Sequence, residues 1–80
     1  MSEIREEFAG LVRLLVDEPN EVDVVEHEHK EGSDLELHVD YGDLGKVIGR
    51  QGRTARSLRS LLSARGQRDN KRYELEILED

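Results

Sequence analysis

The chain has 80 residues, which leaves room for one small domain over residues 1–80 and for no second hydrophobic core. Its 12 basic and 19 acidic residues give a net charge of −7, which by itself argues against a nucleic-acid partner. The absence of cysteine excludes disulfides and thiolate metal sites. No apolar run approaches the roughly 20 residues that span a bilayer, and the N-terminus does not resemble a signal peptide. We therefore expect a cytoplasmic protein without membrane insertion.

The first half of the chain predicts a helix followed by two strands. Apolar residues recur every three or four positions from Ile4 to Val16, which is the spacing of one stripe on an amphipathic helix. Pro19 indicates that this helix ends in the segment 17–20. A valine-rich run predicts a strand from residue 22 to about residue 30, and residues 31–34 predict a turn. Residues 35–40 alternate between apolar and polar side chains, so one face of a second strand should be buried.

The second half predicts two helices and a last strand. Asp43 is a suitable N-cap for a short helix over Leu44 to Ile48. A longer helix follows, which Gly66 is expected to end. Its expected apolar face consists of Ala55, Leu58, Leu61 and Leu62. Residues 73–77 alternate again as a strand. The order α-β-β-α-α-β predicts an α+β fold in which the helices cover one face of a three-stranded sheet.

The segment from Gly45 to Arg53 separates the two helices of the second half. In it Gly49 and Gly52 bracket two long polar residues, Arg50 and Gln51. Glycine lets a ligand's backbone come close and permits dihedral angles that other residues avoid. The second glycine also precedes a helix whose N-terminal N–H groups and dipole favour an anion. The segment therefore predicts a loop that binds phosphate.

The basic residues are concentrated around this loop. Nine of the twelve lie between Lys46 and Arg72, where Asp69 is the single acid, so this segment carries +8 and the rest of the chain −15. A local positive field in an acidic protein is typical of a polyanion-binding surface. Arg53, Arg56 and Arg59 recur every three residues, which places them on neighbouring positions of one helix face.

Together these residues resemble a known family. The motif from Val47 to Gly52 is similar to the signature of the KH domain, whose GxxG loop, here residues 49–52, joins two helices and clamps a nucleic-acid backbone. The extra helix and strand that precede the βααβ core resemble the type II, prokaryotic arrangement. The whole chain is similar to the KhpA family of small bacterial RNA-binding proteins. It departs from the common pattern at Thr54, where an aliphatic residue is common, and at Ala55, where isoleucine is usual, and we expect neither change to touch the loop and both to affect packing more than binding.

The resemblance implies a set of RNA-binding residues. Backbone N–H groups of residues 50–53 are expected to contact phosphates, and parts of residues 35–39 are expected to form the floor or wall of a groove for the bases. The expected contact residues are Lys46, Val47, Ile48, Gly49, Arg50, Gln51, Gly52, Arg53 and Arg56. With only three aromatic residues, a stacking platform is not expected, so sequence preference should be weak and binding sensitive to salt.

The resemblance also implies a function and partners. The expected partner is single-stranded RNA, and the expected role is that of an RNA chaperone or post-transcriptional regulator. A homodimer, or a heterodimer with a KhpB/Jag-type KH protein, is implied, together with a link to cell division and envelope homeostasis. Two alternatives remain open at this point. The domain could serve mainly as a dimer subunit, or as a ribosome-associated factor, with RNA contact secondary.

Other chemistry finds little support in the sequence. There is no nucleophile elbow, phosphate-binding P-loop or dinucleotide fingerprint, so no enzyme activity, small-molecule substrate or cofactor is expected. His27 and His29 could begin a metal site, but their alternation with glutamates is typical of an exposed strand, and no metal is expected. Arg65, Arg68 and Arg72 lie farther from the loop and are interpreted as parts of a solvated face.

Overall fold

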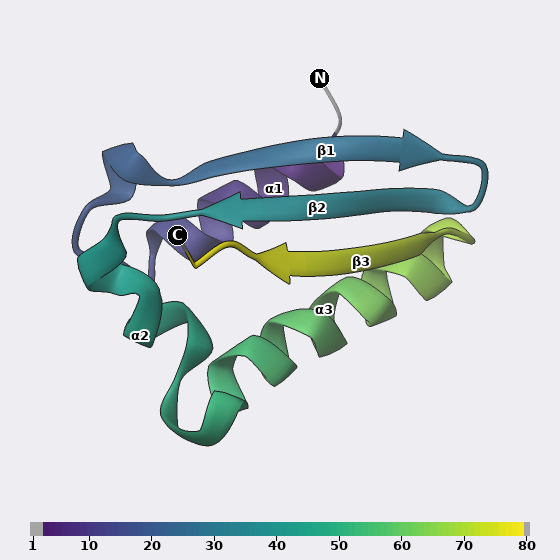
Figure 1. The fold of residues 1–80 in the computed structure, drawn as a ribbon. Helices are drawn as coiled ribbons and strands as arrows, with labels where there is room; N and C mark the ends of the chain where they lie inside the picture. The colour runs from purple at the N-terminus through teal and green to yellow at the C-terminus, as the bar shows by residue number, and fades with distance from the viewer. Residues whose placement is uncertain (1–2, 80) are drawn as a thin grey trace.

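The structure is a computed structural model that describes residues 3–79 (Figure 1). Over these residues the helices and strands follow one another in the predicted order, which confirms the α+β class and the type II arrangement. They are α1 (Glu3–Arg13), β1 (Asp23–His29), β2 (Gly32–His38), α2 (Leu44–Ile48), α3 (Arg53–Asp69) and β3 (Arg72–Ile77). Single turns of 3₁₀ helix, at Pro19–Glu21, Tyr41–Asp43 and Arg50–Gly52, lie in the connections.

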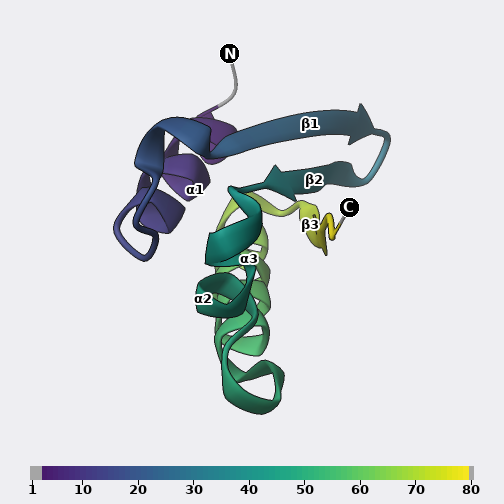
Figure 2. The same ribbon diagram turned by 60° about the vertical axis from the view of Figure 1, so that its left-hand side comes forward.

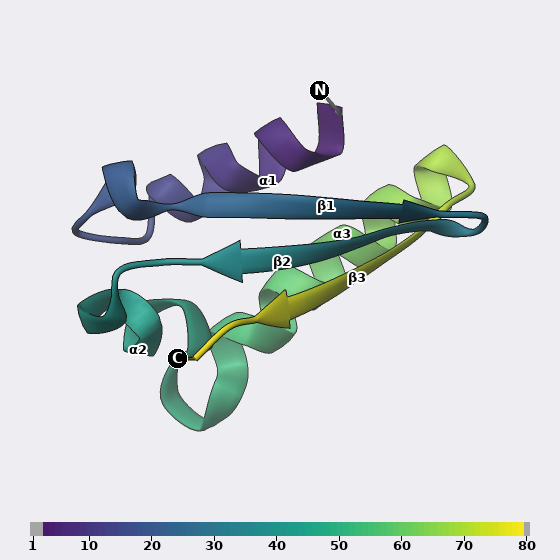
Figure 3. The same cartoon turned by 45° about the horizontal axis from the view of Figure 1, so that its top comes forward.

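The three strands form one mixed sheet in the order β1-β2-β3. β1 pairs with β2 antiparallel, with Val24 opposite Leu37, and β2 pairs with β3 parallel, with Leu35 opposite Leu75. The parallel pair requires a long crossover connection, which α2 and α3 provide. Both α1 and α3 lie on the same side of the sheet, behind the strands in the view of Figure 3.

The core lies between the sheet and these helices. Because side chains alternate along a strand, β2 places Ser33, Leu35 and Leu37 on the covered face and leaves Asp34, Glu36 and His38 on the open one. The helices and strands contribute Ile4, Phe8, Val12, Val24, Leu35, Leu37, Val47, Leu58, Leu62, Tyr73 and Leu75 to one apolar cluster. On the open face, the Nε2 atom of His27 lies 3.3 Å from a carboxylate oxygen of Glu36. Residues 3–79 contain no group of three or more side chains that could hold a metal ion.

Two predicted boundaries in the first half are wrong. α1 ends at Arg13, because the N–H groups of Leu14 and Leu15 bond to carbonyls only three residues earlier, at 3.1 and 2.9 Å, and Leu14 is 82% exposed. The turn between β1 and β2 occupies residues 30–31, and Gly32 is already part of β2. Gly32 lies against the backbone of Arg72 in β3, where a Cβ atom has no space. The glycine is therefore needed for close approach of the strands and not for the turn.

The predicted end of the long helix is also wrong. α3 continues through Gly66 to Asp69 and ends at Asn70, which adopts the left-handed conformation with φ of 55°. The N–H of the next residue, Lys71, donates to the carbonyl of Gly66 at 2.8 Å and completes the cap. Gly66 is buried inside the helix. A Cβ atom there would lie 2.5 Å from the Lys71 carbonyl oxygen, so packing requires glycine at this position. Leu61 is expected on the apolar face of this helix, but its side chain is 54% exposed on the outer side of α3.

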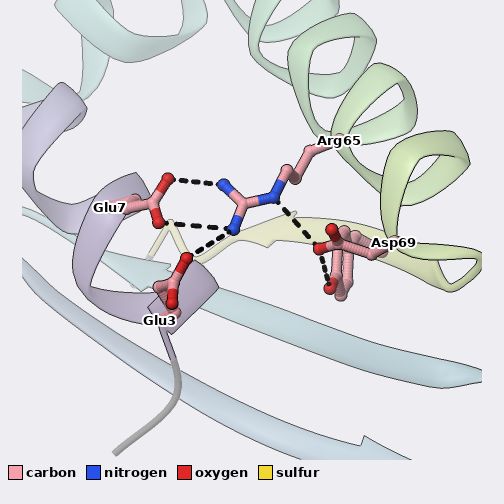
Figure 4. Close-up of polar contacts among 5 residues, drawn as sticks. Glu3, Glu7, Arg65 and Asp69 are labelled. Atoms are coloured by element: carbon pink, nitrogen blue, oxygen red, sulfur yellow. Dashed lines mark hydrogen bonds and ion pairs between the residues drawn. The ribbon is translucent and has the colours of Figure 1, made fainter.

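Arg65 is not part of a solvated face, which corrects the interpretation from sequence. Its side chain is 17% exposed and reaches from α3 to α1, where it pairs with Glu7 and with Glu3 at 3.2 Å (Figure 4). Its Nε donates to Asp69 at 3.0 Å, and Asp69 also accepts a hydrogen bond of 2.7 Å from the Tyr73 hydroxyl. This network, which we call the Arg65 cluster (Glu3, Glu7, Arg65, Asp69 and Tyr73), links α1 to α3.

The Arg65 cluster shifts the pKa values of its members. Hydrogen bonds from the Arg65 guanidinium lower the pKa of Glu7, and the hydrogen bond from the Tyr73 hydroxyl, helped by the charge of Arg65, lowers the pKa of Asp69. Burial, together with the hydrogen bond to Asp69, raises the pKa of Tyr73 to about 12. Both carboxylates are therefore charged at neutral pH and hold Arg65 in place.

Among residues 3–79 no helix combines the length and the apolar character that crossing a bilayer requires.

Candidate nucleic-acid interface

The predicted loop lies at the tip of the helical layer. α2 and α3 pack beside one another, and segment 49–52 joins them at the end that lies farthest from the sheet (Figure 2). In both Figures 1 and 2 this connection extends away from the strands, with no other element beside it. A ligand can therefore reach it without any rearrangement of the fold.

The first glycine of the loop is needed for backbone conformation and for space. Gly49 has φ of 78° and ψ of 170°, which a residue with a side chain rarely adopts. A Cβ atom at this position would lie 2.7 Å from the backbone nitrogen of Thr54 and would also meet the Thr54 side chain. Thr54 therefore packs against the loop, which corrects the expectation that this departure from the family pattern leaves the loop untouched.

The middle of the loop turns through two left-handed residues. Gln51 has φ of 56° and Gly52 has φ of 74°. For a residue with a side chain such as Gln51 this conformation costs about 1 kcal/mol. The turn is held by hydrogen bonds from the Gly52 N–H to the Gly49 carbonyl, at 3.1 Å, and from the Arg53 N–H to the Arg50 carbonyl. Strain that the surrounding structure maintains in this way is common at binding sites.

These hydrogen bonds correct the set of predicted phosphate donors. The N–H groups of Gly52 and Arg53 are already used inside the turn. Within residues 3–79 no turn or loop hydrogen bond takes up the N–H groups of Arg50 and Gln51, which leaves them to a ligand. The first turn of α3 contains no acidic residue and no side-chain cap. The positive end of the helix dipole is therefore open to an anion beside the loop.

The long polar side chains of the motif surround this loop. Arg50, Gln51, Arg53 and Arg56 are all exposed. The Arg53 guanidinium donates to the Gln51 side-chain oxygen at 3.4 Å, and the Arg56 guanidinium lies 3.5 Å from the point where a Cβ atom of Gly52 would be. Three guanidinium groups and one amide are thus concentrated around two free N–H groups, an arrangement that suits a phosphate backbone.

Lys46 is placed beside the loop but is not free. Its ammonium lies 3.3 Å from a carboxylate oxygen of Asp17 and 3.8 Å from one of Asp43. Asp43 itself is 2% exposed and does not cap α2 through its side chain, contrary to the prediction. Its two oxygens instead accept hydrogen bonds from the backbone N–H groups of Asp17, at 3.2 Å, and Glu18, at 3.0 Å. Asp43 thereby fixes the segment after α1 against the start of α2.

The predicted groove residues separate into buried and accessible ones. Val47, Leu35 and Leu37 are fully buried, so their side chains support the fold, and for Val47 this burial argues against the predicted contact with RNA. Their burial follows from their place between α2, α3 and the sheet. Ile48 and Val39 are only partly buried and remain available to a ligand. Gly49 and Gly52 are also partly exposed.

Comparison with known proteins identifies the family. The family model described as "KhpA/KhpB, KH domain" matches residues 6–77. A protein of Aquifex aeolicus named RNA-binding protein KhpA is 46% identical over 79 residues, which cover 99% of this chain and 100% of the relative. Proteins of the same name from Chlamydia trachomatis and Treponema pallidum are 42% identical over 77 residues and 46% identical over 72 residues. These two alignments cover 96% and 90% of this chain, and 99% and 90% of the relatives.

No solved structure matches the chain significantly. The alignments with the sequence relatives cover almost the whole length of both chains, which is sufficient to assign the family. The KH domain is a nucleic-acid-binding module and not an enzyme fold. The chain belongs to the KhpA/KhpB family of KH domains.

Proposed function

We propose that this protein binds single-stranded RNA through the loop 49–52, and that the chain works as one KH domain. The observation that carries the proposal is the exposed loop in which Arg50 and Gln51 present free N–H groups beside the acid-free N-terminus of α3. Relatives that match nearly the whole chain are named RNA-binding proteins, which supports RNA as the ligand.

Binding of this kind should depend on phosphates more than on base identity. Of the three aromatic side chains, Phe8 and Tyr73 are buried in the core, and Tyr41, in the turn before α2, is the one that is exposed, at 79%. One exposed aromatic side chain does not make a platform for successive bases, which would lie mainly against partly buried apolar side chains such as Ile48. Weak sequence preference and a strong dependence on salt follow, because phosphate contacts release counterions.

A double substitution in the loop tests the proposal. Arg50→Asp with Gln51→Asp replaces two exposed side chains by carboxylates that repel phosphate. We expect the affinity for an octa-uridylate, measured by fluorescence anisotropy at low salt, to fall about a hundredfold or more, because two charge-assisted contacts become repulsive. The circular dichroism spectrum should remain unchanged, since neither side chain belongs to the core.

The matched control changes charge equally at a distance from the loop. Arg13→Asp with Asn20→Asp also replaces one arginine and one amide by aspartate at exposed positions. Compared with the unmodified protein at about 0.1 M salt, it should retain the affinity within a few-fold, because nonspecific field effects are then screened over about 10 Å. Wild-type affinity in the loop variant would contradict the proposed site.

The finer function rests on family membership. We propose that RNA binding serves an RNA chaperone or post-transcriptional role in the cytoplasm, with a KhpB/Jag-type KH protein as partner and with a link to cell division and envelope homeostasis. Crosslinking followed by RNA sequencing would identify the bound transcripts, with the loop variant as the negative control. A pull-down that recovers no second KH protein would contradict the partner assignment.

One surface favours a dimer as a second candidate function. Leu61 is 54% exposed on the outer side of α3. It lies at a shallow hollow of about 750 Å³. The lining of this hollow, which we call the α3 outer surface, consists of Arg53, Arg56, Ser57, Ser60 and Leu61. An exposed leucine surrounded by small serine side chains permits close approach of a second helix, and we propose that two copies, or this chain and a related KH domain, pair through it.

A further inference from the structure

A polar cavity lies at the other end of α3. It has a volume of about 640 Å³ and lies between the C-terminal half of α3 and the first half of β3. Its lining consists of Glu31, Arg59, Ser63, Gly66, Gln67, Asn70, Lys71, Arg72, Tyr73, Glu74 and Leu75. We call it the α3–β3 cavity. None of the residues predicted to contact RNA lines it.

One face of α3 connects the GxxG loop to this cavity. Positions Arg56, Arg59, Ser63 and Gln67 are spaced by three or four residues, so they form a continuous stripe along the helix, at the end of which lies the capping residue Asn70. From Arg53 beside the loop to Gln67 in the cavity, the helix rises about 21 Å at 1.5 Å per residue. A single strand bound at the loop can therefore follow one helix face into the cavity.

Arg59 marks the point where this path meets the sheet. Its guanidinium donates a 3.3 Å hydrogen bond to the carbonyl of Leu75. β3 lies at the edge of the sheet, and among the described residues no further strand pairs with its outer side, where Arg59 binds this carbonyl. The arginine thus spans the gap between helix and strand where the α3–β3 cavity begins. Beyond it, the small exposed side chain of Ser63 lines the cavity, and the tightly packed Gly66 closes its floor.

The chemistry of the cavity matches a nucleotide. Three cations line it against two acids, and the Arg72 guanidinium is paired with Glu74 at 3.3 Å. Within residues 3–79 no ion pair or side-chain hydrogen bond involves Lys71, which is exposed and available to a phosphate. Gln67 and Asn70 add amide groups, which both donate and accept hydrogen bonds and can therefore contact base edges or a ribose hydroxyl.

We propose that the α3–β3 cavity is a second RNA subsite, which holds a nucleotide of the same strand beyond those bound at the GxxG loop. The inference rests on the proposed function, because it extends the strand that the loop holds. A GxxG loop clamps four nucleotides. The protein should therefore gain affinity when the RNA is longer than that, with Lys71 contacting a phosphate and the two amides contacting the nucleotide.

The dependence of affinity on RNA length tests the subsite. We expect the unmodified protein to bind octa-uridylate about tenfold more tightly than tetra-uridylate, the gain of one or two extra contacts. Lys71→Glu should remove this gain while leaving the affinity for tetra-uridylate unchanged. For the octamer, the slope of log affinity against log salt should fall by about 0.7, the value of one lost phosphate contact with a single strand. Gln67→Ala, which leaves the charge unchanged, should also reduce the gain.

The controls separate this inference from the proposed function. Arg13→Glu makes the same charge change at an exposed residue of α1 that does not line the cavity, and it should preserve the gain with length. The loop variant Arg50→Asp with Gln51→Asp should lose both RNAs, and if it binds both, the proposed function is wrong. The second subsite is excluded if the unmodified protein binds the octamer no more tightly than the tetramer, or if Lys71→Glu keeps the gain in affinity with length. In either case the loop site stands, provided that the loop variant loses both RNAs.

Discussion

At the scale of single residues, Gly10 and Gly66 illustrate how surroundings decide the role of a helical glycine. Both lie inside helices, where glycine costs up to about 1 kcal/mol relative to alanine. A Cβ atom at Gly10 would meet nothing within 4 Å. At Gly66 it would lie 2.5 Å from the Lys71 carbonyl oxygen, on the backbone that leads into β3. Only the second glycine is required by packing.

Alanine at these two positions should therefore have opposite effects on stability. We expect Gly10→Ala to raise the free energy of unfolding by about 0.5–1 kcal/mol, through helix propensity alone. Gly66→Ala should lower it by about 1–2 kcal/mol, because the cost of overpacking against a backbone exceeds that gain. Urea unfolding of both variants beside the unmodified protein measures the difference. A stabilised Gly66→Ala would mean that β3 can move away from α3 at little cost.

Asp43 shows a residue whose position was predicted from sequence and whose role was not. Its place before α2 is that of an N-cap, and local pattern can reveal no more. Its carboxylate instead binds two N–H groups of residues 17 and 18, which are about 25 positions away in the chain. A long-range partner of this kind leaves no periodic signal, so the sequence alone could not indicate it.

At the scale of elements, the Arg65 cluster couples the first helix to the last one. α1 lies beside β1, and α3 lies behind β2 and β3, so the two helices are linked through Arg65 across the covered face (Figures 3 and 4). Because the pKa values of Glu7 and Asp69 are lowered in the folded protein, both carboxylates bind fewer protons there than in the unfolded chain at acidic pH. Their contribution to stability is complete above the ordinary carboxyl pKa values of about 4 and is lost as the pH falls through the lowered values.

This linkage predicts how a variant without Arg65 responds to acid. Arg65→Met should be less stable than the unmodified protein at pH 7, and the gap should narrow as the pH falls below about 4, where the carboxylates are protonated. Arg68→Met is the matched control on the same helix, since Arg68 contributes only weakly to the lowered pKa of Glu7, and it should retain most of the pH dependence. Urea unfolding at pH 7 and pH 3 measures both gaps. If Arg65→Met and the unmodified protein lose the same free energy of unfolding between pH 7 and pH 3, the linkage is wrong.

The elements themselves were largely predictable from the sequence, but their ends were not. Periods of two and of three to four residues indicated α1, β2, α3 and β3, because burial imposes them on one face of each element, whereas β1 was indicated by its valines and α2 by its place before the loop. The loop could be predicted from Gly49 and Gly52, because no other residue adopts their positive φ angles as readily. The end of α3 was missed because Asn70, and not Gly66, takes the left-handed conformation. The α3–β3 cavity combines distant segments, and local patterns do not reveal it.

At the scale of the whole molecule, charge is unevenly distributed between the helical layer and the rest of the chain. The chain carries −7 overall, while the arginines of the loop and of α3 concentrate positive charge on the helical layer. Two copies that meet through the α3 outer surface would bring two loops close together, because Arg53 and Arg56 border the same hollow as Leu61. Two linked sites raise the effective concentration for one RNA strand, so pairing would strengthen binding without any new contact to RNA.

Replacement of Leu61 tests this arrangement without changing the charge. In a symmetric dimer the Leu61 side chain is buried in both copies, and Leu61→Gln should cost about 1 kcal/mol of burial energy in each. The dimer dissociation constant, measured by sedimentation equilibrium, should therefore rise about thirtyfold. Leu14→Gln is the matched control, since Leu14 is 82% exposed after α1 and does not line the hollow, and it should leave the constant unchanged. If the unmodified protein stays monomeric at high concentration, or both variants weaken the dimer equally, the α3 outer surface does not form the interface, and the exposed leucine must be explained by a different partner.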